Sequence, residues 1–135
     1  MRSSRPASAL PAGVLVAVDA FALVAFVLAG IRSHHEVGAL DLIARNVIPL
    51  GISWLVVSAV VGTYRRPGLR TLLITWVAAV PLGIVARSLW VGSPSGGELL
   101  VFVGVASAFT LLFLLVGRWI AASIGRRMLP VGSDP

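Results

Sequence analysis

The stretch LVAVDAFALVAFVLAG, residues 15–30, is apolar throughout except for one carboxylate, Asp19. An uncharged run of about 20 residues is the signature of a transmembrane helix. A charged group inside such a helix is expensive to bury, and it is expected to have a partner and a purpose. The stretch therefore predicts a first membrane-spanning helix and raises the question of which residue neutralises Asp19.

The rest of the chain follows the same pattern. It has 135 residues, 58% of them hydrophobic and 12% charged, with a mean hydropathy of +0.99, whereas soluble domains carry about 25% charged residues. Four apolar segments, each long enough to cross a bilayer, are joined by short connections that make successive helices antiparallel. We predict an all-α fold, a polytopic bundle of four transmembrane helices at about residues 10–31, 42–61, 71–91 and 99–122.

This bundle is expected to form one transmembrane domain over residues 1–135, with a short basic N-terminus (1–9) and a C-terminal tail (123–135). All eleven cations are arginine, and the net charge is +6. The arginines gather at the ends of the apolar segments, so we expect no nucleic-acid partner and take the lipid bilayer as the first partner. The N-terminus, the YRRPGLR connection (64–70) and the C-terminal end are arginine-rich, whereas Glu36, Asp41 and Glu98 fall on the opposite side. The positive-inside rule then predicts a multi-pass protein of the cell (plasma) membrane with both termini in the cytoplasm.

Asp19 lies about 15 Å from the cytoplasmic end of its segment, near the expected midplane. Arg87 lies in the outer half of the third segment and has no acidic residue nearby in sequence. We predict that Asp19 faces the bundle interior and approaches Arg87, with Arg45 as the second choice.

The remaining polar residues have local explanations. Arg45 and Asn46 begin the second segment, and Asp41, four residues before Arg45, is placed to pair with it. Arg118 is near the cytoplasmic face, where its side chain can extend to water. Tyr64 is expected in the interfacial aromatic belt and Trp54 in helix packing.

The connection RSHHEVG after the first segment holds a second group of candidate residues. A metal site is not favoured, because adjacent histidines cannot both reach one ion from one helix face and zinc needs three or four placed ligands. Helical spacing instead pairs Arg32 with Glu36. A solvated outer loop is the favoured interpretation, and the sharper alternative is that His34 or His35 accepts protons and passes them toward Asp19. We expect neither a metal nor a cofactor.

Small residues indicate where helices approach closely, because in lipid tight packing replaces the hydrophobic driving force. We predict such contacts along the first segment and along the fourth, and a third where a glycine one turn before Arg87 leaves room for its guanidinium. The residues are Ala22, Ala25 and Ala29, then Gly104 and Ala108, and finally Gly83.

These positions together resemble the small prokaryotic membrane proteins grouped as domain-of-unknown-function family 3054. The resemblance spans about residues 15–122 and implies a similar size and helix number, and no established activity. The matching residues are the acid Asp19, the turn residues Gly30, Ser33 and His34, the pair Arg66 and Pro67, and Gly83 with Arg87.

Three functions are open at this point. The first is a small transporter or channel-like protein that uses a buried Asp19/Arg87 layer. The alternative is a non-catalytic accessory or scaffold subunit, either a homo-oligomer or bound to a larger membrane partner, which predicts small-residue stripes facing lipid and no continuous polar path. An enzyme is not expected, because no nucleophile–base pair or metal set is visible.

Overall fold

The computed structural model describes residues 10–33 and 40–128, and within these ranges every regular element is an α-helix. The helices are α1 (Ala12–Ser33), α2 (Leu40–Val61), α3 (Leu69–Val91) and α4 (Gly96–Met128). Each is long and apolar enough to cross a membrane. The predicted all-α, four-helix membrane fold is confirmed, and the protein is a multi-pass membrane protein.

Glycines in the left-handed conformation mark the ends of α2 and α3. Gly62 has a φ of 75° and its N–H bonds to the carbonyl of Ser58, and Gly92 has a φ of 77° with the same bond to Ser88. Glycine reaches this conformation without the steric penalty that other residues meet, so it ends a helix cleanly. The turns that connect α2 to α3 and α3 to α4 are therefore short, and the three helices alternate in direction.

The fourth helix differs most from its predicted bounds. It has 33 residues and is therefore about 50 Å long, well beyond the thickness of a hydrocarbon core of about 30 Å. Residues 123–128, predicted to lie in the tail, continue the helix. A helix of this length carries Arg118 well within a regular helical segment rather than at a frayed end.

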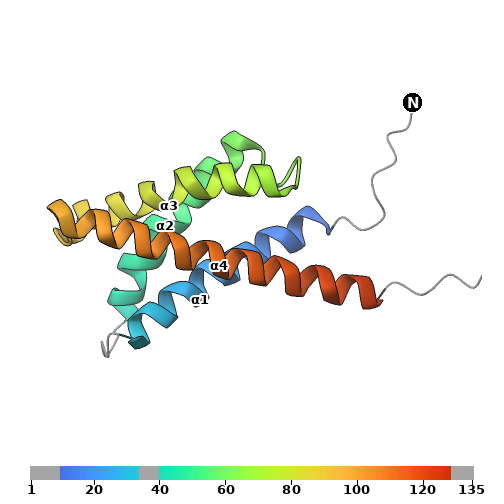
Figure 1. Cartoon of the computed structure of the whole chain (residues 1–135), viewed down its shortest axis with the longest axis horizontal. Coiled ribbons are helices and arrows are strands. Elements are labelled where there is room, and N and C mark those ends of the chain that lie inside the picture. Colours follow the sequence, from blue (N-terminus) through green and yellow to red (C-terminus); the bar gives the residue numbers. More distant parts are fainter. Residues whose placement is uncertain (1–9, 34–39, 129–135) are drawn as a thin grey trace, which may run out of the picture.

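The four helices form a closed ring of neighbours. The helix α1 packs against α2 and α4, and α3 also packs against α2 and α4 (Figure 1). The N-terminal end of α1, the α2–α3 turn and the C-terminal end of α4 lie toward one end of the bundle, and the α3–α4 turn lies toward the other (Figure 1). We call these the α2–α3 end and the α3–α4 end.

The closest helix pair is α2 with α3. Gly83 of α3 is buried, and a Cβ atom there would lie 2.5 Å from the Ser53 Oγ and 2.8 Å from the Leu50 Cα of α2. Only glycine permits this approach, so the predicted packing role of Gly83 is confirmed. The apolar core beside it includes Trp54, Leu72 and Val80.

Candidate functional site

Asp19 forms a two-pronged ion pair with Arg118. The Nε atom of Arg118 donates to Oδ1 of Asp19 at 2.8 Å, and its Nη2 atom donates to Oδ2 at 2.6 Å. The Asp19 side chain is fully buried and that of Arg118 is 14% exposed. Charge-assisted bonds of this kind are stronger than neutral hydrogen bonds, and the countercharge of Arg118 offsets part of the cost of burying the carboxylate.

A chain of aromatic donors completes the site. The hydroxyl of Tyr64, in the α2–α3 turn, donates to Oδ2 of Asp19 at 2.9 Å, and the indole nitrogen of Trp54 in α2 donates to the Tyr64 oxygen at 2.9 Å. Oδ2 therefore accepts from both Arg118 and Tyr64. We call these four residues, Asp19, Arg118, Tyr64 and Trp54, the aspartate centre; it links α1, α2, α4 and the α2–α3 turn.

Local packing explains how the centre comes together. Gly117 of α4 lies against α1, where a Cβ atom would meet the Val18 Cγ1 at 3.3 Å and the Ala22 Cβ at 3.7 Å. This close approach places the next residue of α4, Arg118, beside Asp19. The turn that carries Tyr64 is held to α3 by a buried hydrogen bond between the hydroxyls of Thr63 and Thr75.

Tyr64 stays un-ionised over the whole physiological range. Its partial burial, together with the negative charge of Asp19, raises the pKa of the phenol from 10 to about 12. Only the neutral phenol can donate a hydrogen bond to the carboxylate. The raised pKa therefore agrees with Tyr64 being the donor to Asp19.

Arg87 has different partners at the α3–α4 end. Its Nε donates to the Asn46 Oδ1 of α2 at 2.6 Å, one terminal nitrogen donates to the carbonyl of Ser93 at 2.9 Å, and its guanidinium carbon lies 5.5 Å from the centre of the Phe102 ring. Asn46 is held in turn by a 2.7 Å bond from its amide nitrogen to the Leu42 carbonyl. We call Arg87, Asn46, Ser93 and Phe102 the arginine centre.

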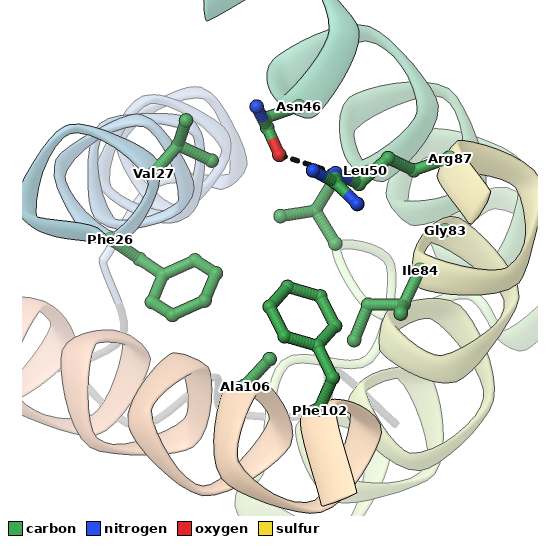
Figure 2. A pocket seen from close by; sticks show the side chains of 9 residues that line it. All are labelled: Phe26, Val27, Asn46, Leu50, Gly83, Ile84, Arg87, Phe102 and Ala106. Atoms are coloured by element: carbon green, nitrogen blue, oxygen red, sulfur yellow. Dashed lines mark hydrogen bonds between the residues drawn. The ribbon is translucent and has the colours of Figure 1, made fainter. Parts of the chain in front are cut away.

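A small cavity adjoins this guanidinium. Figure 2 shows Arg87 reaching from α3 toward the space between the helices, with Asn46 on one side and the rings of Phe26 and Phe102 on the other. The cavity measures about 30 Å³, which suffices for one or two water molecules. Its remaining lining is largely apolar, so the polar side chains that face the cavity are those of Arg87 and Asn46.

The predicted pairing of Asp19 with Arg87 is wrong, and so is the second choice of Arg45. Asp19 bonds to the α2–α3 turn, whereas Arg87 bonds to the α3–α4 turn, so the length of α3 separates them. Asp19 does face the interior, as predicted, but it lies at the level of a turn. The expectation that the Arg118 side chain extends to water is also wrong, because its guanidinium points inward and pairs with the Asp19 carboxylate.

Residues 16–121 match a family model described as a protein of unknown function, DUF3054. The chain belongs to the DUF3054 family. No curated protein and no solved structure matches the chain.

The DUF3054 match covers every residue of both centres and all four helices, apart from the first residues of α1 and the C-terminal end of α4. The resemblance noted from the sequence is thus confirmed. It assigns no activity, so the chemistry must be argued from the geometry of the two centres.

The remaining candidates divide into confirmed and untested predictions. Arg45 pairs with Asp41 over one turn at 2.5 Å, as predicted, and both side chains are largely exposed. The predicted outer-loop residues His34, His35 and Glu36 lie outside the described residues, so the proposed Arg32–Glu36 pair stays a prediction. Within residues 10–33 and 40–128, no group of three histidine, aspartate or glutamate side chains is placed to bind a metal.

The small residues do not all lie at helix contacts. In α1, Ala22 is buried and Ala25 is half-buried, but Ala29 is exposed. In α4, both Gly104 and Ala108 are exposed, and the space beside Gly104 is open. Within the described part of the single chain this second pair makes no helix contact, because α4 turns a different face, with Ala106, Thr110 and Leu114, toward its neighbours; the predicted contact of Gly104 and Ala108 with another helix stays a prediction.

Three residues of the aspartate centre were not recognised from the sequence as parts of one site. Arg118 and Tyr64 lie near segment ends, where an interfacial position is the default expectation, and Trp54 resembles a packing residue. One signal was available: Gly117, immediately before Arg118, is a small residue of the type that brings two membrane helices together.

Proposed function

We propose that this protein is a non-catalytic accessory or scaffold subunit that binds other membrane helices through the outer face of α4. The observation that carries the proposal is the position of Gly104 and Ala108. They lie one helical turn apart on an exposed face, with nothing within 4 Å of a Cβ atom at Gly104. Small residues at this spacing let a second helix approach closely, and close approach is what stabilises helix pairs in lipid.

The arrangement of charges supports the same proposal over transport. Asp19 is fully buried and neutralised by Arg118, and Arg87 lies at the other end of the bundle. The core between the two centres holds fully buried apolar residues such as Ala79 and Val80, and the buried hydroxyls of Ser53 and Thr110 bond to carbonyls of their own helices. A proton or solute pathway needs connected polar groups or water at membrane depth, and neither of these two hydroxyls bonds to either centre.

The proposal is tested by enlarging the small residues on α4. We expect the double change Gly104→Leu and Ala108→Leu to abolish self-association or partner capture, measured by chemical cross-linking in native membranes. The matched control is Ala78→Leu, which adds a similar side chain to an exposed position of α3. Cross-linking that is unchanged by the α4 substitutions would overturn the proposal.

The transport alternative has its own measurement. We expect proton flux into liposomes that contain the native protein to equal the flux into liposomes without protein, measured with an internal pH-sensitive dye. Flux that rises with the amount of native protein would favour transport over the scaffold proposal.

We also propose that the α2–α3 end faces the cytoplasm of a cell membrane. The support is the clustering of Arg65, Arg66 and Arg70 at the α2–α3 turn and of Arg126 and Arg127 at the end of α4. The chain has no cysteine, so single cysteines report topology directly. We expect an impermeant maleimide to label Gly97→Cys in intact cells and Gly68→Cys only after lysis; the reverse pattern would contradict this orientation.

A further inference from the structure

An apolar groove opens on the membrane-facing surface between α1 and α2. It has a volume of about 130 Å³ and is lined by side chains of both helices, including Leu23, Val24 and Leu55, with Trp54 and Tyr64. Small residues on both walls, Ala20 and Gly51, leave this space, and a Cβ atom at Gly51 would meet nothing within 4 Å. The groove therefore has the character of a slot for an unbranched hydrocarbon chain.

The end of the groove marked by Tyr64 adjoins a strongly basic turn. Arg65 and Arg66 directly follow Tyr64, Arg70 lies in the first turn of α3, and all three are exposed. Neither ion pair in the described part of the chain involves these arginines. The acid that Tyr64 contacts, Asp19, is fully buried against Arg118 and does not offset their charge.

An apolar slot that ends beside clustered cations is complementary to one class of molecule. We propose that the α1–α2 groove binds an acyl chain of an anionic glycerophospholipid whose phosphate lies at Arg65 and Arg66. Basic residues at a membrane surface attract anionic lipids through the negative potential of the leaflet. The groove adds selectivity for a lipid over a soluble phosphate, because burial of the acyl chain in the groove contributes favourable binding free energy. The site is distinct from the α4 face, which lies on another helix.

Trp54 lines the groove and provides a fluorescent reporter there. A variant that keeps Trp54 and replaces the other three tryptophans by phenylalanine gives fluorescence from this position alone. It is reconstituted into phosphatidylcholine bilayers that contain equal fractions of a brominated lipid, either phosphatidylglycerol or phosphatidylcholine, because bromine quenches indole fluorescence on contact. We expect brominated phosphatidylglycerol to associate with the groove about fivefold more strongly for each contributing arginine, with the preference weakening at high salt.

Two variants, each with a matched control, separate the contribution of the groove from that of the arginines. Gly51→Leu projects a side chain into the groove from a position where the Cβ meets nothing within 4 Å, and it is expected to remove the excess quenching by phosphatidylglycerol. Its control is Ala59→Leu, at an exposed position on the same helix. Arg65→Gln with Arg66→Gln is expected to abolish the preference between the two lipids and leave quenching by both. Arg126→Gln with Arg127→Gln removes the same charge from the end of α4 and is expected to leave the preference intact.

Several results would overturn the proposal. Equal quenching by the two brominated lipids in the single-tryptophan protein shows that no anionic lipid is selected. A preference that survives Gly51→Leu places the lipid elsewhere. Quenching that is weak with both lipids and falls further as the protein density rises shows that a second copy of the chain, and not a lipid, occupies the groove.

Discussion

The aspartate centre and the arginine centre lie at opposite ends of the same bundle. The first is built around a buried anion, Asp19, and the second around a cation, Arg87, and the two charges are stabilised by different kinds of partner. Asp19 is fully buried and meets a full countercharge together with a phenol donor. Arg87 is half-buried and meets an amide, a carbonyl and an aromatic ring. A carboxylate sealed from water needs a cation, whereas a long arginine side chain near a helix end satisfies its donors with neutral acceptors.

The largest expected effect is at the aspartate centre. Arg118→Gln leaves the buried carboxylate of Asp19 without its countercharge. Asp19→Asn likewise leaves the guanidinium of Arg118 without its countercharge. Each is expected to destabilise the fold by about 3–5 kcal/mol, measured as a shift in unfolding by denaturing detergent. A change in the free energy of unfolding near zero for either variant would show that the ion pair is exposed to water. The two centres would then not differ in how their charges are stabilised.

The next effect concerns the helix approach one turn before Arg87. Gly83→Ala places a methyl group against the Leu50 backbone and the Ser53 hydroxyl, and we expect a loss of about 1–3 kcal/mol from overpacking. Gly97→Ala is the matched control in open space on α4 and is expected to be neutral or slightly stabilising. Equal behaviour of the two variants in thermal unfolding would contradict the packing of α2 on α3.

Arg87→Gln is expected to have a smaller effect, about 1 kcal/mol, because it removes hydrogen bonds to neutral partners and strands no buried charge. The same unfolding measurement compares it directly with Arg118→Gln. If Arg87→Gln proves the more damaging of the two, the ranking of the centres is reversed.

The smallest effect is a shift with pH. Tyr64 is the single tyrosine of the chain, so absorbance at the tyrosinate band follows it alone, and its pKa is raised to about 12. Because the folded pKa lies above the unfolded value of 10, the contribution of Tyr64 to stability is complete below pH 10 and is lost as the pH rises toward 12. Half-ionisation near pH 10 in the folded protein would show that the phenol is not held against Asp19.

The contrast also shows what the sequence can predict. The four helices follow from hydropathy and turn residues, both of which are local, and the Asp41–Arg45 pair follows from helical spacing. The partner of Asp19 does not, because Arg118 lies 99 residues away. The position of Arg118 along the bundle depends on the length of α4, which continues past the predicted end. It also depends on the close approach of α4 to α1 at Gly117. Likewise, the outward orientation of Gly104 depends on which face α4 turns to its neighbours, a tertiary property.

Two double-mutant cycles test the central claim most directly, namely that Asp19 is sealed by Arg118 and is independent of Arg87. One cycle combines Asp19→Asn with Arg118→Gln, and the other combines Asp19→Asn with Arg87→Gln, both measured by unfolding in the same detergent. We predict a coupling energy of about 2–3 kcal/mol for Asp19 with Arg118, and additivity within about 0.5 kcal/mol for Asp19 with Arg87. Additive losses in the first cycle together with strong coupling in the second would contradict the account.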